Sequence, residues 1–460
     1  MGLLSLEMAA ELDKPNPSLR RSLSFDFPDG TRRYSDVALC SDSLGFHEPL
    51  VKRWGTIADA IGDSRDAIQI PAWQGLEIID QDKDWSTRGS KFNLKGTVVT
   101  LRYCSMNVAP ANWLTRFVGI LKGWSFADEP VIGVTCGPDD RALLSPFPKV
   151  RLSLGDFPKL PKDSPALFAP ISPYGRHDSF GIGSIDGQIA PIYVGEYTEG
   201  SVTGSKYVIG LGPILRVLHA YANGVRLAAT TWSATPTVEV INGRAWSRIQ
   251  FNSKRSTQEI TLDVEGIEVS GTAPPEALIA DPVGQIRHLL AHFVYFEDFD
   301  SYSTLNRWSD VGEAALDIPS LTESQTYLLR RIPQGYRGGR YLAASEEPQD
   351  AIDVLNEWLH SQHMKAFWTY AGKLAIRPDN LDDPGYIDTP WIRHQYHELT
   401  SGPLKPIAEQ ENVIGRVMIE GAYGEALGTF QEKLLVVSQE QEQASTAADS
   451  VQGPWLPAYI

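Results

Sequence analysis

The stretch that decides the fold reads TVVTLRYCSM at 97–106, WLTRFVGILKGWSF at 113–126 and PVIGVTCGPDDRALL at 130–144. It holds three apolar, β-branched runs, Thr97–Cys104, Thr115–Leu121 and Pro130–Cys136, each bounded by Gly, Pro, Asn or Asp. Such runs are typical of β-strands. Two glycines within Phe117–Trp124 indicate a bulge or the close approach of another backbone. Nothing in this stretch is arranged for chemistry.

Further short strand patterns precede this stretch, with turn residues such as Pro28-Asp29-Gly30 between them. They are Ser22–Phe27, Arg32–Leu39, Leu50–Trp54, Ala67–Ile70 and Leu76–Ile79. Many short strands with regular turn spacing are typical of an antiparallel barrel or sandwich. We therefore expect one β-domain from about Ser22 to Ser145.

The composition bounds the class of protein. A chain of 460 residues is expected to form two to four domains, and its hydrophobic content of 42% can supply their cores. The net charge of −16 is the reverse of the basic stripe expected on a protein that clamps nucleic acid. It suits a conduit through which DNA slides, although acidity can also serve solubility alone.

The cysteines and the N-terminus indicate a protein made in the reducing cytoplasm. Cys40, Cys104 and Cys136 are far apart and form no CxxC motif, which argues against a disulfide framework or a zinc site. We expect all three to be small buried hydrophobes. No run of eighteen apolar residues predicts a membrane span, and the N-terminus lacks the basic region of a signal peptide. Leu3, Leu4, Met8 and Ala9 predict a short helical arm that docks on something or frays.

The middle of the chain begins with a proline-rich segment, Pro146–Pro173, which predicts an extended linker. The glycines of 181–197 do not have GxGxxG spacing, so a nucleotide site is disfavoured. Tyr221–Val225 predicts a hairpin with an Asn-Gly turn. The remaining strand patterns of this part are Thr237–Ile241, Ala245–Phe251 and Gln258–Val264.

Helical spacing appears after this point. Pro282–Tyr295 predicts a helix with Asp281 as N-cap, and Asp350–Met364 predicts a second one. A hairpin comes next, with strands Lys365–Tyr370 and Lys373–Arg377 around Ala371-Gly372. Later strand patterns are Glu411–Gly421 and Phe430–Val437.

A few residues could carry chemistry. His288 and His292 have the i, i+4 spacing of a zincin, but Leu289 stands where the general base Glu is needed, so simple packing is favoured. His360/His363 and His394/His397 repeat an HxxH spacing, and for both pairs we likewise favour simple packing or exposure to solvent over metal binding. Glu297, Asp298 and Asp300 lie among aromatic residues, so a glycosidase cleft stays one interpretation of this segment. The sequence shows no signature for the second acid that a glycosidase needs. Ser179–Ser184 lacks a GxSxG elbow. We predict no catalytic, cofactor-binding or metal-binding residues and no enzymatic activity.

One pattern of the opening stretch resembles the first barrel of phage tail-hub proteins, the siphophage-type hubs at the baseplate or tail tip of long-tailed phages. It consists of Phe117, Gly119, Leu121, Trp124, Val134-Thr135-Cys136, Asp140, Leu143 and Leu144. Similar fragments occur in the family's order at Arg33–Asp36, Glu48–Gly55, Asp66–Ile70, Gly75–Asp82, Pro191–Gly195, Tyr221–Val225 and Gln258–Gly266. The most specific is AFWTYAGKLAIRP at 366–378, which resembles the helical domain of the hubs.

The resemblance implies a mainly β protein with a smaller α+β part: two antiparallel β-barrel (tube-type) domains plus accessory β and α/β domains. We expect an N-terminal arm (1–21), a first barrel (22–150), a linker with a second β-rich domain (151–275), a helix-containing α/β domain (276–384), a second barrel segment (385–440) and a C-terminal tail (441–460).

The resemblance also implies a function and partners. Three subunits would form a homotrimer that joins the sixfold tail tube to a threefold tip, because two barrels per chain offer six similar faces. The implied partners are a distal tail protein ring, the C-terminus of the tape-measure protein and tail-tip or fibre proteins, with DNA only in transit. The implied location is the virion tail tip, after assembly in the host cytoplasm. An acidic lumen is a further hypothesis, and a glycan or cell-wall hydrolase and a carbohydrate-binding adhesin stay open as alternatives.

Overall fold

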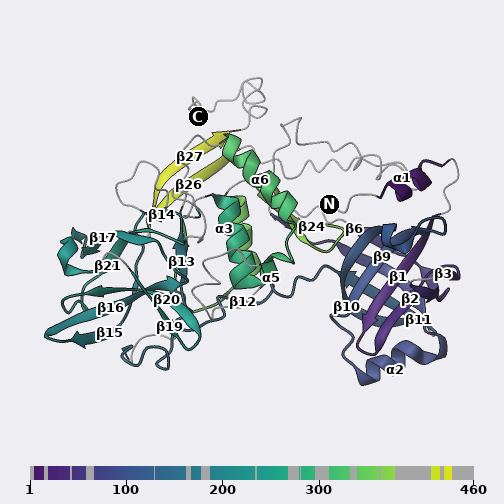
Figure 1. The fold of residues 1–460 in the computed structure, drawn as a ribbon, viewed down its shortest axis with the longest axis horizontal. Helices are drawn as coiled ribbons and strands as arrows, with labels where there is room; N and C mark the ends of the chain where they lie inside the picture. The colour runs from purple at the N-terminus through teal and green to yellow at the C-terminus, as the bar shows by residue number, and fades with distance from the viewer. Residues whose placement is uncertain are drawn as a thin grey trace, which may run out of the picture.

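The computed structural model describes residues 5–14, 19–41, 44–58, 67–128, 130–161, 167–177, 187–233, 236–267, 279, 281–295, 310–331, 339–361, 364–378, 416–424 and 429–437. Figure 1 shows a barrel, a central group of helices and a β-rich region one after another along the long axis. Strands dominate the described residues, so the prediction of a mainly β fold is confirmed.

The first sheet is antiparallel throughout and has the order β2-β1-β9-β10-β11-β8-β5, with β6 also paired to β8. Its strands are β1 (Leu19–Phe27), β2 (Gly30–Tyr34), β5 (Val51–Arg53), β6 (Thr56–Ala58), β8 (Ala72–Ile79), β9 (Val98–Ser105), β10 (Leu114–Asp128) and β11 (Val131–Gly137). The longest, β10, was expected to end at Leu121. It continues to Asp128, with Gly123 opposite Thr135 of β11 and a shift of register between Leu121 and Gly123, where the glycines predicted a bulge or a close approach.

Backbone hydrogen bonds join the two edges of this sheet at one end. Glu48 N donates to Arg33 O at 2.9 Å, Ser35 N donates to Glu48 O at 2.8 Å, and Val51 N donates to Ser35 O at 2.9 Å. These bonds tie the end of β2 to the start of β5, the strands at opposite edges of the sheet order. Closure satisfies polar groups that an open edge would leave unpaired. The antiparallel sheet therefore curls as a half-barrel, with its two edges tied together at this end.

Short elements cover the barrel from outside and from one end (Figure 1). Helix α1 (Leu6–Leu12), begun by Ser5 as N-cap, buries Met8 against Leu39, Cys104 and Trp113. The expected helical arm therefore docks. The other covering elements are β3 (Leu39–Ser41), β4 (Gly45–His47), α2 (Asp84–Lys91) and the 3-10 turns η1 (Gln81–Lys83) and η2 (Pro110–Asn112). Helix α2 has no counterpart in the sequence prediction.

The β-rich region contains two sheets, of which one has the order β19-β20-β16-β13-β22 with β15 paired to β16, and the other β14-β21-β17-β18. The strands are β13 (Ile171–Tyr174), β14 (Arg176–His177), β15 (Ile192–Glu199), β16 (Val202–Leu211), β17 (Arg216–Ala222), β18 (Val225–Arg226), β19 (Thr237–Ile241), β20 (Arg244–Phe251), β21 (Ile260–Glu265) and β22 (Arg340–Leu342), with the 3-10 turn η3 (Ala229–Thr231). Asn223 and Gly224 have φ of 49° and 76°, so the predicted Asn-Gly hairpin turn is confirmed.

Helices and a small sheet form the central region. They are α3 (Pro282–His288), its π-helical continuation η4 (Leu289–Val294), α5 (Asp310–Glu313), α6 (Ile318–Arg331), α7 (Ala351–His360), β24 (Met364–Trp368) and β25 (Leu374–Pro378). The predicted cap is confirmed, since Gly284 N donates to Asp281 Oδ1 at 2.6 Å. The predicted order of helix, strand, Gly turn and strand also holds for α7, β24 and β25.

The proline-rich segment is not a free linker. Phe147, Val150, Leu152 and Phe157 are each at most 5% exposed and belong to the largest hydrophobic core, together with residues of α3 and α7. Strand β12 (Pro146–Phe147) pairs with β23 (Gln349–Asp350). Its large apolar residues therefore pack into the core, and residues 153–160 form turns in which Phe157 N donates to Ser153 O at 2.9 Å.

Of the expected second barrel segment, 385–440, the structure describes one antiparallel hairpin, β26 (Arg416–Gly424) with β27 (Thr429–Val437). Both strands overlap the predicted ones. The rest of that segment and the C-terminal tail, 441–460, lie outside the described residues. The second barrel therefore stays a prediction.

Candidate functional site

The pattern that resembles phage hubs builds the wall and interior of the barrel. Phe117 is 5% exposed, and its ring meets Trp73 of β8 edge-on at 5.5 Å between centroids. Leu121 and Cys136 are buried beside them in the same core. These positions come from facing strands, so they fill the barrel interior as alternation along a strand requires.

The two glycines of β10 have different surroundings. A β-carbon on Gly119 would overlap the carbonyl oxygen of Gly137 and lie 2.6 Å from Cζ of Phe117. A β-carbon on Gly123 would meet nothing within 4 Å. Gly119 is therefore a point of close backbone approach, as expected, and Phe117 folds over the space that the missing side chain leaves.

Helix α2 lies at one end of the barrel (Figure 1). Its Trp85 is 1% exposed and belongs to the barrel core. The indole meets Phe25 and Phe27 edge-on at 5.1 and 5.2 Å between ring centroids. Trp124 packs against the same helix, with its Cη2 atom 2.9 Å from where a β-carbon of Gly89 would be. Edge-to-face aromatic contacts of this kind add to the hydrophobic gain of burial.

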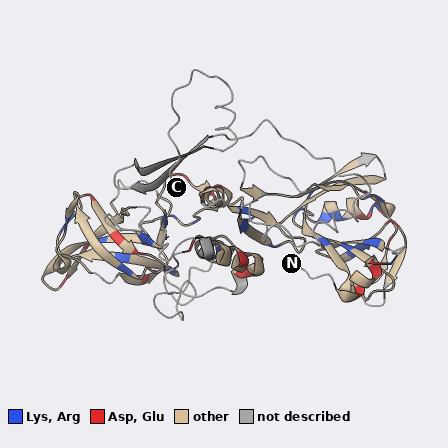
Figure 2. Ribbon diagram, turned by 90° about the horizontal axis from the view of Figure 1, so that it is seen from above, with Lys and Arg blue, Asp and Glu red and all other residues tan. Residues whose placement is uncertain are grey.

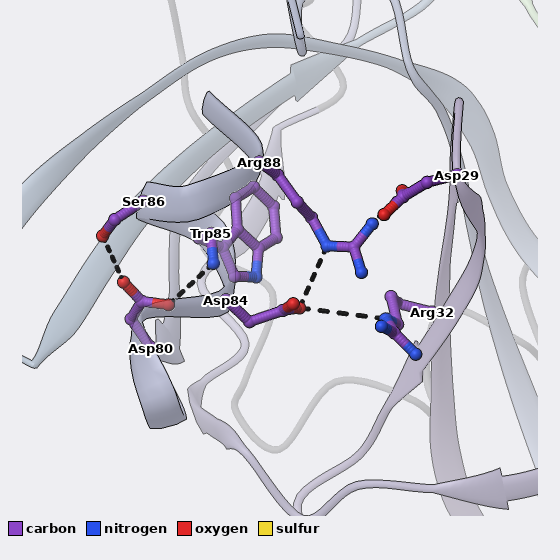
Figure 3. A network of polar contacts seen from close by, with 7 residues as sticks. All are labelled: Asp29, Arg32, Asp80, Asp84, Trp85, Ser86 and Arg88. Carbon is purple, nitrogen blue, oxygen red and sulfur yellow. Dashed lines mark hydrogen bonds and ion pairs between the residues drawn. The ribbon is translucent and has the colours of Figure 1, made fainter. Parts of the chain in front are cut away.

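A polar network fixes α2 in this position (Figure 3). The Asp80 carboxylate accepts from Trp85 N at 2.8 Å and from Ser86 Oγ at 2.6 Å. The guanidinium of Arg88, 5% exposed, pairs with Asp84 at 3.1 Å and with Asp29 in the β1–β2 turn. Removal of one partner from such a pair would leave the Arg88 charge buried and unpaired, which is strongly destabilising. The network therefore holds α2 against the end of the barrel. Its residues do not form a paired nucleophile and general base.

The barrel is fused to the central helices through its β6–β8 connection. Strand β7 (Ile68–Gln69) leaves the barrel and pairs in parallel with β24, and Ala366 N donates to Ala67 O at 2.7 Å. Ala67 and Ile68 are buried in the core of the central region. A parallel strand so distant in sequence from its partner has no local signal, which is why sequence reasoning missed it.

Further contacts strengthen this junction. The guanidinium of Arg116 on β10 lies 4.1 Å from the ring centroid of Tyr370. Gly372, at φ 74°, brings the β24–β25 turn against Val118. Asp140 of the hub-like pattern forms an ion pair with Lys122, and Leu143 beyond it is fully buried in the central core. Leu144 is half exposed. The pattern thus runs from the barrel into its connection with the next region.

His288 and His292 are packed, as expected. Both are fully buried, and their rings stack with centroids 4.3 Å apart. The Nδ1 atom of His288 lies 3.0 Å from the hydroxyl of Tyr174. In the described part of the chain, no group of three or more His, Cys, Asp or Glu side chains is placed to hold a metal ion.

Other titratable groups have environments that the sequence did not indicate. Burial lowers the pKa of His177 to about 4, although backbone hydrogen bonds act in the opposite direction. Burial raises the pKa of Cys104 to about 11 and raises that of Cys136 as well. Cys40, however, is exposed, so the expectation that all three cysteines are buried is wrong. It lies on the short β3–β4 hairpin, which has one solvated face.

Charges of both signs are spread over the barrel and the β-rich region (Figure 2). Among the described residues, no helix is long and apolar enough to cross a membrane. The remaining residues singled out by sequence lie outside the described residues: Ser179–Ser184, Glu297, Asp298, Asp300, His363, His394 and His397.

Comparisons with known proteins add little to this picture. No family model and no curated protein matches the chain. Among solved structures it matches a chain described as "Virion of native gene transfer agent (GTA) particle", at a TM-score of 0.26 and 13% sequence identity. The match covers 65% of this chain and 92% of that one. A TM-score of this size does not establish a shared fold.

Proposed function

We propose that the chain is a structural protein of a phage-type virion, a tail-tip or baseplate hub subunit that assembles as a homotrimer. The observation that carries the proposal is the barrel whose interior is built from the hub-like pattern, with Phe117 and Leu121 in its core. The order of the later regions supports it: a β-rich region, then a helix and an aromatic hairpin, α7 with β24 and β25.

The junctions between regions also support a mechanical role. Strand β7 pairs with β24, β12 pairs with β23, and β13 pairs with β22. Each pairing joins segments far apart in the chain and links neighbouring regions through backbone hydrogen bonds. The pairings are short, but Ala67, Ile68 and Phe147 of these segments are buried in the central core, and such packing restricts relative motion of domains. A stiff subunit of this kind suits the end of a tail tube.

In the proposed assembly, three subunits seat on the sixfold tube and leave a channel for DNA and the tape-measure protein. The partners are a distal tail protein ring, the C-terminus of the tape-measure protein and tail-tip or fibre proteins. The net charge of −16 fits DNA that passes without being held. An acidic bore stays part of the proposal, and a positive potential along the bore of the assembled ring would contradict it.

Light scattering coupled to size exclusion, with negative-stain imaging of the same peak, tests the assembly. We expect a species of three times the 50.8 kDa chain mass and a threefold ring. A monomer at every concentration, or a ring of another symmetry, would refute the trimeric hub.

The proposal includes that the chain is not an enzyme. The alternative of a glycan or cell-wall hydrolase rests on Glu297, Asp298 and Asp300, whose geometry lies outside the described residues. A turbidity assay on purified cell walls decides between them. We expect no clearing, and clearing that is lost in Glu297→Gln would favour the hydrolase. Glycan-array binding would test the adhesin in the same way.

A further inference from the structure

Two arginines stand side by side on the outer wall of the barrel. Leu23 and Phe25 of β1 point into the core, so Ser22 and Ser24 point outward. Arg102 of β9 lies directly opposite Ser22, and Arg33 of β2 lies directly opposite Ser24. Residues opposite one another in an antiparallel pair share a face. The two guanidinium groups therefore flank β1 on its outer side.

The buried imidazole of His47 lies beside Ser22 on this side of β1. His47 is fully buried, and its Nε2 lies 2.8 Å from Ser22 Oγ. Burial lowers the pKa of His47, and the charges of Arg33 and Arg102 lower it further. The border that His47 and Ser22 form is polar, and among the described residues no ion pair joins it to either guanidinium group.

The chain itself supplies little counter-charge here. Within the described residues, neither Arg33 nor Arg102 has a carboxylate oxygen within 4.0 Å of its guanidinium nitrogens. Asp26, the nearest acid on the same face of β1, accepts from Thr31 Oγ1 at 2.8 Å. Burial lowers the pKa of Arg102, Asp26 raises it, and the like charge of Arg33 lowers it. Both arginines are half-buried.

Most other arginines of the barrel have partners. Arg88 pairs with Asp29 and Asp84, and Arg53 lies 3.7 Å from Glu77. Arg33 and Arg102 differ from these arginines in that neither has an ion pair within the described residues. Planar guanidinium groups bind carboxylates by paired, charge-assisted hydrogen bonds, and such a ligand would also relieve the repulsion between the two arginines.

We propose that Arg33 and Arg102, bordered by His47 and Ser22, form a docking site for a carboxylate side chain on an acidic segment of a neighbouring protein subunit. The site does not depend on the trimeric hub. DNA phosphate is the less favoured ligand, because the net charge of −16 repels a long polyanion whereas a short acidic segment brings only a local charge.

Fluorescence anisotropy with a hexaglutamate peptide carrying a neutral fluorophore tests the site on the full chain at low salt. We expect saturable binding, at least about ten-fold weaker in Arg33→Gln/Arg102→Gln. The matched control is Lys52→Gln/Arg53→Gln, which removes the same charge from exposed positions of the same barrel. We expect it to change binding by less than about two-fold, since non-specific attraction follows net charge alone.

A second measurement does not depend on the variants. Hexaglutamate should raise the melting temperature of the wild-type chain, and hexaglutamine should not, because only a ligand of the folded state stabilises it. Absence of peptide binding, equal loss in the control variant, or unchanged binding in the double variant would each overturn the site. Stabilisation by inorganic phosphate without binding of hexaglutamate would overturn its assignment to a carboxylate.

Discussion

Replacement of Gly119 by alanine tests how tightly the barrel wall is built. The new β-carbon would lie 2.6 Å from Cζ of Phe117, below the 3.0 Å that real β-carbons keep, and closer still to the carbonyl oxygen of Gly137. Phe117 could turn its ring away. The carbonyl belongs to the backbone of β11 and can move only if the β10–β11 pairing is distorted.

We therefore expect Gly119→Ala to destabilise the barrel by about 1–3 kcal/mol, the usual cost of forcing atoms into a packed core. Local opening should then expose the amides of β9, β10 and β11 about 5- to 150-fold more often. Hydrogen exchange measured by mass spectrometry on the full chain resolves this by peptide. Peptides of β16 and β20, in the β-rich region, should keep their wild-type rates.

Gly123→Ala on the same strand is the matched control. Its β-carbon would meet nothing within 4 Å, and its φ is not in the left-handed region. Alanine also restricts the unfolded chain, so we expect unchanged protection or a gain of a few tenths of a kcal/mol. Equal protection in the two variants, or a greater loss in Gly123→Ala, would refute the reasoning.

Three more outcomes are expected from the described residues. Trp85→Ala should lower the free energy of unfolding by about 3–5 kcal/mol, because it leaves a cavity at the end of the barrel. Phe92→Ala, at a position 37% exposed, should lower it far less. Urea unfolding followed by tryptophan fluorescence compares the two variants, and equal losses would mean that α2 does not close the barrel. The pKa of His177 falls from 6.5 to about 4 on folding, so as the pH is lowered the unfolded chain takes up this proton at a higher pH than the folded chain. Between pH 6.5 and pH 4 the free energy of unfolding should therefore fall by about 3 kcal/mol. Urea titrations at pH 7, 5.5 and 4 should show this loss in the wild type and a smaller one in His177→Gln, and parallel losses would contradict the assignment. Titration of the native chain with a thiol reagent should modify Cys40 alone at first, and Cys104 and Cys136 should react only after unfolding. Equally fast reaction of all three cysteines would show that the reagent reaches the barrel interior in the native state.

Sequence patterns within a single segment predicted the strands, turns and helix starts that depend mainly on neighbouring residues. Alternation predicted the strands of the barrel, the Asn-Gly pair predicted the turn at Asn223, and Asp281 with Pro282 predicted the start of α3. Helix α2 gave no such signal, because it is short, polar and interrupted by Gly89. Its position depends on Trp85 and on ion pairs that exist only after the barrel has formed.

The parts of the candidate site that depend on pairing across the chain were also out of reach. The prolines of 146–173 predicted an extended linker, but residues 153–160 form hydrogen-bonded turns, and Phe147 and Phe157 are buried in one core with residues of α3 and α7. Helix α6 was missed, since its apolar positions are sparse and its buried face is defined by β25 and α3. The facing of Arg33 and Arg102 requires the register of three strands, which no single stretch of sequence contains.

The pairing of β7 with β24 has a practical consequence for anyone dissecting this chain. A fragment cut at residue 150 would keep every strand of the barrel yet uncover Ala67, Ile68, Leu143 and Phe147, all buried in the intact protein. Contiguous apolar surface of that kind promotes aggregation. The smallest piece that we expect to stay in solution must therefore carry residues 349–378 as well, supplied in cis or added as a second polypeptide.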